Sequence, residues 1–111
     1  MVFVATFAQA QHLGPNEFYI LGSGGNSCAK WLEEREYQSL RAQRMEWLLG
    51  FLTGYNYSTN TSRQVRPQDG QSALAFVDRY CADNPLSNVT AAAAALVEAL
   101  GGRKAEHPWK R

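Results

Sequence analysis

The 111-residue sequence has little net charge, few metal-binding side chains and no long apolar run. Its formal charge is +1, so electrostatics give no reason to expect binding to nucleic acid or to an anionic membrane surface. A membrane-spanning helix needs roughly 20 apolar residues, and because no stretch approaches that length, no membrane span is expected. Two histidines, His12 and His107, and two cysteines fall short of the usual zinc site. We expect neither a metal nor another cofactor.

The composition is that of a folded globular domain, with 45% hydrophobic and 19% charged residues. A chain of 111 residues supports one domain with a small core. In a domain of this size, a covalent cross-link supplies a large share of the net stability. The two cysteines, Cys28 and Cys81, therefore bear on both the fold and the compartment.

Three roles compete for Cys28 and Cys81, which lie far apart in the sequence. A metal site is not favoured, because neither cysteine has further metal ligands close to it in the sequence. A catalytic cysteine is not favoured, because neither histidine lies in a periodic stretch that would hold it in place as a base. A structural disulfide is favoured, and two buried free thiols remain the alternative. Closing a loop of about 50 residues stabilises a fold by about 4 kcal/mol in the chain-entropy description. No acid–base pair or nucleophile is apparent, so no catalytic residue is assigned and an enzyme is not expected.

The first ten residues are uncharged and mostly apolar, and they end in Ala8-Gln9-Ala10. Small residues in this spacing are typical of a signal-peptidase site. We therefore interpret residues 1–10 as the end of a truncated signal peptide, with the mature protein beginning near Gln11. Together with the disulfide, this predicts a periplasmic or secreted bacterial protein.

The rest of the chain divides into three parts. Residues 11–25, which include most of the glycine-rich stretch GSGGN, are expected to form a flexible segment. Residues 26–102 are expected to form the disulfide-linked helical domain. Residues 103–111 form a basic tail.

Apolar spacing and capping residues predict helices in the first half of this domain. A short helix is expected to begin near Cys28, after a cap at Asn26 or Ser27. The longest periodic stretch, residues 37–56, predicts a second helix. No stretch shows the alternation of a strand, so the predicted fold class is all-α.

Two further helices are expected in the second half of the domain. One covers about 71–83 and stops at Asn84-Pro85, because the residue before a proline is pushed out of helical geometry. The last follows a cap at Ser87 or Asn88, contains an alanine run and ends at Gly101-Gly102. The result is a small bundle of about four helices with one disulfide.

The helix predicted over 37–56 carries the candidate binding residues. Its apolar face contains Met45, Leu48, Leu52 and Tyr55, and the opposite face contains Ser39, Gln43, Glu46, Gly50 and Thr53. Trp47 and Phe51 widen the apolar face and, with Tyr55, are the candidate protein-binding aromatics.

Gly50 and Gly54 are costly inside a helix, so we expect them to permit close approach of another backbone. Packing against a helix of the same chain is favoured. The alternative is a shallow groove for a partner helix, with a second copy of the chain as one candidate partner.

The segment 57–70 is polar, lacks periodicity and contains a proline, so it is expected to be an exposed loop. Arg63 and Arg66 make it positive. They could contact an acidic partner, although a solvated loop is the favoured interpretation.

The stretch VDRYCADNP, with Tyr80, Cys81, Asn84 and Pro85, carries a family resemblance. Together with Cys28 and the aromatic-and-glycine stretch WLLGFLTGYN, it resembles small exported bacterial proteins of the HdeA/HdeB acid-stress chaperone type. A related pattern occurs in periplasmic immunity proteins that block secreted amidase effectors of type VI secretion. The similarity covers about residues 28 to 100. It implies a disulfide-linked helical scaffold that binds other proteins, either unfolded clients or one cognate effector.

Acid conditions would change the charge of this chain strongly. At pH 2 the carboxylates are protonated and the formal charge rises from +1 to about +13. This repulsion would loosen a small bundle and expose Trp47 and Phe51 while a disulfide kept the chain compact. The predicted function is that of a small exported protein-binding protein of the acid-stress chaperone type. The alternative is an immunity or inhibitor protein that binds a secreted amidase-type effector.

Overall fold

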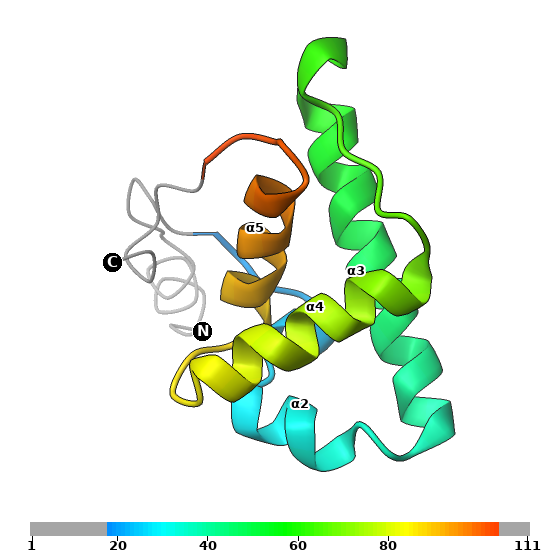
Figure 1. Cartoon of the computed structure of the whole chain (residues 1–111), viewed down its shortest axis with the longest axis vertical. Coiled ribbons are helices and arrows are strands. Elements are labelled where there is room, and N and C mark those ends of the chain that lie inside the picture. The colour runs from blue at the N-terminus through cyan, green and yellow to red at the C-terminus, as the bar shows by residue number, and fades with distance from the viewer. Residues whose placement is uncertain (1–17, 105–111) are drawn as a thin grey trace, which may run out of the picture.

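The computed structural model describes residues 18–104, and Figure 1 shows their arrangement. The predicted signal segment 1–10 and most of the basic tail, residues 105–111, lie outside the described residues. The described part contains four α-helices, α2 (Cys28–Glu34), α3 (Gln38–Ser58), α4 (Gly70–Asp83) and α5 (Val89–Ala99). A short 3-10 helix, η1 (Gly22–Gly25), precedes α2, and another, η2 (Thr61–Arg63), lies between α3 and α4. Within this part of the chain no strand is present, so the predicted all-α bundle is confirmed.

Side-chain caps define where three of the helices begin. Ser27 Oγ accepts a hydrogen bond from the Lys30 amide at 3.1 Å and caps α2, as one of the two predicted cap residues. Asn88 caps α5 in the same way, with its Oδ1 2.8 Å from the Ala91 amide nitrogen. Asp69, which the sequence prediction missed, caps α4. The α4 helix therefore starts one residue earlier than expected.

The core forms where α4 meets the other three helices, and Figure 1 shows α4 crossing in front of α3 and continuing below α5. The helix α5 contacts α4, α3 and η1, and most of its residues are buried. Its alanine run lets these elements approach closely, and Ala92 and Ala93 are fully buried. The other buried apolar side chains are Cys28, Trp31, Leu48, Leu52, Tyr55, Val65, Ala73, Leu74, Val77, Cys81, Val89, Ala91, Leu96 and Val97.

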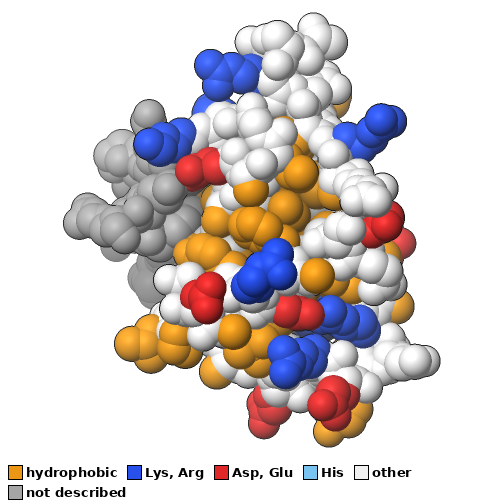
Figure 2. Space-filling model, viewed as in Figure 1, with side chains coloured by type: hydrophobic (Ala, Val, Ile, Leu, Met, Phe, Trp, Pro, Cys, Tyr) orange, Lys and Arg blue, Asp and Glu red, His pale blue; other side chains and the backbone are white. Residues whose placement is uncertain are grey.

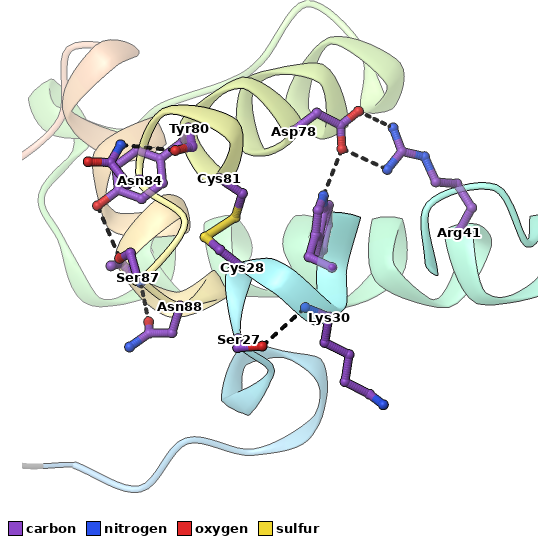
Figure 3. The surroundings of a disulfide bond; sticks show 12 residues. Ser27, Cys28, Lys30, Arg41, Asp78, Tyr80, Cys81, Asn84, Ser87 and Asn88 are labelled. Carbon is purple, nitrogen blue, oxygen red and sulfur yellow. Dashed lines mark hydrogen bonds and ion pairs between the residues drawn. A yellow bond between two sulfur atoms is a disulfide. The ribbon is translucent and has the colours of Figure 1, made fainter. Parts of the chain in front are cut away.

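The disulfide between Cys28 and Cys81 is present and fully buried, and it joins the start of α2 to the end of α4. A disulfide in a small protein is compatible with an oxidising compartment. Beside it, two backbone hydrogen bonds of 3.0 Å join the N-terminal ends of α2 and α5. The Cys28 amide donates to the Ser87 carbonyl, and the Val89 amide donates to the Asn26 carbonyl. Three helix ends are thus fixed at one point, which Figure 3 shows.

Residues 22–25, predicted to belong to a flexible segment, form η1 and pack on the core. Gly24 is buried, and its carbonyl accepts a 2.9 Å hydrogen bond from the Thr90 hydroxyl. The Trp47 indole N–H donates to the Leu21 carbonyl at 2.6 Å. The packed domain therefore begins near Leu21 and not at residue 26.

Candidate functional site

The three predicted binding aromatics do not share one exposed surface. Trp47 and Phe51 are half-buried and in contact, with ring centroids 5.4 Å apart. Tyr55 is buried, because it lies on the same face of α3 as Leu48 and Leu52 and that face meets the core. Its assignment to an exposed binding surface is wrong for the folded protein.

The Trp47 ring is covered by the chain itself. Its indole N–H is bonded to Leu21, and its ring atoms lie against the backbone of Gly22 and Gly24. The strap of residues 21–25 therefore occupies the surface that a partner would need. In this conformation Trp47 is a packing residue, and a partner reaches it only after the strap moves.

Gly50 and Gly54 do not serve close helix packing, contrary to the prediction. Both are exposed, and a Cβ atom built at either position has no other heavy atom within 4 Å. The reason is their place on α3: Gly50 shares a face with polar residues such as Gln43 and Glu46, and that face points to solvent. A partner surface at these glycines stays a prediction.

Other elements do approach closely at Gly24, as they do at Gly70 and Gly102. A Cβ atom there would overlap the Trp47 ring and lie 2.8 Å from the Thr90 hydroxyl oxygen. Gly24→Ala is expected to lower the free energy of unfolding by about 1 to 3 kcal/mol through overpacking. Gly50→Ala is the matched control, and it should raise the stability by up to about 1 kcal/mol because alanine favours an exposed helix position.

Urea denaturation of both variants at pH 7 measures these changes. Static light scattering on the same samples shows whether Gly50→Ala alters the mass of the particle in solution. Destabilisation by Gly50→Ala with no loss by Gly24→Ala would contradict the assignment of the close contact to Gly24.

A charged cluster fastens the first half of α3 to its neighbours, and Figure 3 shows Arg41 facing Asp78. The Arg41 guanidinium donates to both Asp78 carboxylate oxygens, at 3.0 and 2.7 Å. The buried Trp31 indole N–H donates to the same carboxylate at 2.7 Å, and the Arg41 guanidinium lies over the Trp31 ring. One carboxylate of α4 thus binds residues of both α2 and α3.

A second carboxylate, Glu34 at the end of α2, pairs with two cations. It accepts a hydrogen bond from Arg44 on α3 and lies 3.1 Å from the Lys30 ammonium group. The other end of the Arg44 guanidinium reaches the Ser23 hydroxyl at 3.4 Å. Arg44 therefore lies between α2 and η1.

Both carboxylates have pKa values below their ordinary values. Burial alone would raise the pKa of Asp78, but the hydrogen bonds from Arg41 and Trp31 and the charges of Arg41 and Arg35 outweigh it. The pKa of Glu34 is lowered chiefly by the hydrogen bond from Lys30, against a smaller opposing effect of burial, with further lowering by Arg44. Both groups therefore stay ionised, and paired, at neutral pH.

The sequence alone does not reveal this cluster. Arg41 and Arg44 are three positions apart and therefore lie on one side of α3, which is only a weak indication of a charged contact there. Their partners lie on other helices, however, and helical spacing says nothing about which carboxylates the fold brings near. The disulfide is the predicted site that the structure confirms.

Several apolar side chains are exposed, and the turn between α4 and α5 holds the most exposed of them. The Leu86 side chain is 100% exposed. The turn is nevertheless well fixed, because the Ser87 amide donates to the Asn84 carbonyl and the Asn84 side-chain amide donates to the Tyr80 carbonyl. Tyr57, near the end of α3, and Tyr37, before its start, are also exposed.

Across residues 18–104 no group of three or more His, Cys, Asp and Glu side chains is placed to hold a metal ion. No helix in that range is long and apolar enough to span a membrane. The chain matches no protein-family model, and no curated protein or solved structure shows significant similarity to it.

Proposed function

We propose that this is an exported protein that binds apolar segments of other proteins under acid conditions, in the manner of a chaperone. At neutral pH the apolar face of α3 is packed against the core and the strap covers Trp47. Acid releases α3 from the rest of the bundle and exposes its apolar face, while the disulfide keeps α2 and α4 together.

The placement of the two ion pairs carries this proposal. Both guanidinium groups, of Arg41 and Arg44, belong to α3, and both carboxylates, of Glu34 and Asp78, belong to α2 and α4. The disulfide links α2 to α4 and leaves α3 without a covalent cross-link to them. Loss of the carboxylate charges therefore weakens the attachment of one helix, and that helix carries Leu48, Leu52, Trp47 and Phe51.

The direction of the pH dependence follows from the pKa shifts. A carboxylate whose pKa is lowered by folding stabilises the fold above its ordinary pKa, and this stabilisation is lost as the pH falls through the folded value. The ordinary values are 3.8 for Asp78 and 4.5 for Glu34, so the stabilisation begins to decline near these values and is lost as the pH falls further, through the lower pKa values of the folded protein. The rising positive charge of the whole chain acts in the same direction.

Light scattering from an aggregation-prone test protein at pH 7 and pH 3 tests this function. An equimolar amount of the oxidised protein should suppress scattering at pH 3 and have little effect at pH 7. Trp fluorescence should report the exposure of Trp47 over the same pH range. Equal scattering with and without the protein at pH 3 would refute the proposal.

A dedicated binder of one secreted partner, as in immunity or inhibitor proteins, is the second candidate. The turn that presents Leu86 favours it, because a fixed turn with an exposed apolar side chain loses little entropy when a partner pocket closes on it. This function predicts a stoichiometric complex at neutral pH that Leu86→Asp abolishes and Tyr57→Asp leaves intact. Isothermal titration with the purified partner decides between these outcomes.

A further inference from the structure

We infer that four basic residues form a docking surface for an acidic, extended segment of another protein. These residues, called the basic patch, are Arg63, Arg66, Arg103 and Lys104. All four are exposed. The inference is independent of acid-induced opening, since it concerns the folded protein at neutral pH.

The fold brings the patch together from two distant segments through Tyr55. The Tyr55 hydroxyl donates to the Arg63 carbonyl at 2.9 Å and accepts from the Arg103 amide at 2.8 Å. One buried side chain thus holds the backbone of η2 against the backbone that follows α5. The backbone positions of the two arginines are therefore set by the folded core.

A second anchor fixes the backbone next to Arg66 and near Lys104. The Asn56 side-chain amide makes two 2.8 Å hydrogen bonds to the Val65 backbone, one to the carbonyl and one from the amide. Val65 is buried, and its side chain packs against the backbone of Gly102, where a Cβ atom would lie 2.9 Å from it. Arg66 follows Val65, and Lys104 lies two residues beyond Gly102, so both extend from anchored backbone.

The charges of this patch are not neutralised by the described part of the chain. Among residues 18–104, ion pairs join Lys30 and Arg44 to Glu34 and Arg41 to Asp78, and no ion pair involves a member of the basic patch. The acidic residues nearest to the patch in the sequence are Asp69, whose carboxylate caps α4, Glu98 on α5, and Glu106, which lies outside the described residues. Figure 2 shows Lys and Arg side chains at the left and right edges of the upper part of the molecule, with an acidic side chain beside those on the left, and acidic and basic side chains interspersed over its lower part.

The chemistry of the patch favours carboxylates. The Arg103 guanidinium lies over the Tyr55 ring, 5.9 Å from its centroid, and this contact orients the group while leaving its N–H donors available. A planar guanidinium binds a carboxylate through two parallel hydrogen bonds. A protein segment with several Asp or Glu residues fits this surface better than nucleic acid, because the patch is small and the chain as a whole carries a formal charge of only +1.

Fluorescence anisotropy with a labelled peptide of eight glutamates tests the inference on the full-length oxidised protein at pH 7 and low salt. The peptide should bind, and Arg63→Gln/Arg66→Gln should weaken binding by about 5- to 30-fold, the range expected for the loss of two exposed charge contacts. Arg103→Gln/Lys104→Gln should weaken it to a similar extent, because the patch is built from both segments.

The matched control is Arg35→Gln/Arg79→Gln, which removes the same net charge from exposed positions outside the patch. It should change the affinity less than about twofold. An equal loss in the control would show that only the net charge matters and would overturn the inference. Absence of peptide binding, or tighter binding of a single-stranded oligonucleotide of equal charge, would overturn it as well.

Discussion

Replacing both cysteines with alanine (Cys28→Ala/Cys81→Ala) is expected to lower the free energy of unfolding by about 4 kcal/mol at pH 7. The bridge closes a loop with a sequence separation of 53, and its removal returns that conformational freedom to the unfolded chain. The effect is large for this domain, since α2 has only seven residues and is not stable without its attachment to α4. Urea denaturation measures the loss.

Reduction of the wild-type protein with dithiothreitol provides the control, because it opens the same loop without changing the sequence. The reduced protein should denature at nearly the same urea concentration as the double variant. Both cysteines are fully buried, so reduction should be slow until urea begins to unfold the protein. A loss below about 1 kcal/mol in both samples would show that the bridge has little effect on the unfolded chain.

Asp78→Asn is expected to lower the free energy of unfolding by about 2 to 3 kcal/mol at pH 7, because hydrogen bonds to a charged group are the stronger ones. The substitution removes the charge that pairs with Arg41, and it leaves the partly buried guanidinium without its carboxylate. The hydrogen bond from the buried Trp31 indole is weakened as well. The helix α3 loses one of its two ion-paired attachments to the disulfide-linked helices.

The difference between Asp78→Asn and the wild type should shrink as the pH falls below about 4, because acid protonates the wild-type carboxylate and removes the same charge. Urea denaturation between pH 2.5 and pH 7 measures this convergence. Asp83→Asn on the same helix is the control, since Asp83 is exposed and makes no ion pair with another described residue. A pH-independent difference for Asp78→Asn would refute the role of its charge.

Local signals in the sequence predicted the helices well. Cap residues such as Ser27 and Asn88, and the stop at Asn84-Pro85, depend on neighbours within a few positions, so the sequence shows them directly. The disulfide was predictable because only two cysteines exist and other roles lacked supporting residues.

The glycines were a harder case. The helical period placed Gly50 among polar residues, and this signal was correct, whereas the general association of glycine with close packing was misleading. The need for glycine at position 24 depends on Trp47 and Thr90, which are distant in sequence. Helical spacing cannot identify such a contact, because the strap that makes it has no periodic pattern.

The charged and polar contacts of the candidate sites were also beyond sequence reasoning. Asp78 finds Trp31 and Arg41 only after three helices have packed. Tyr55 shows the same limit: its position on the apolar face predicted contact with the core, but not that its hydroxyl would join η2 to the segment after α5.

The backbone bonds that join the starts of α2 and α5 also determine when the domain can be completed during synthesis. The Asn26 carbonyl and the Cys28 amide find their partners at Val89 and Ser87, and Gly24 finds its partner at Thr90. Since the chain is made from its N-terminus, these contacts wait until the last helix has emerged from the ribosome. Closure of such long loops is slow compared with local helix formation. We expect fragments that end before α5 to remain unfolded, and α2 to reach its native contacts among the last elements.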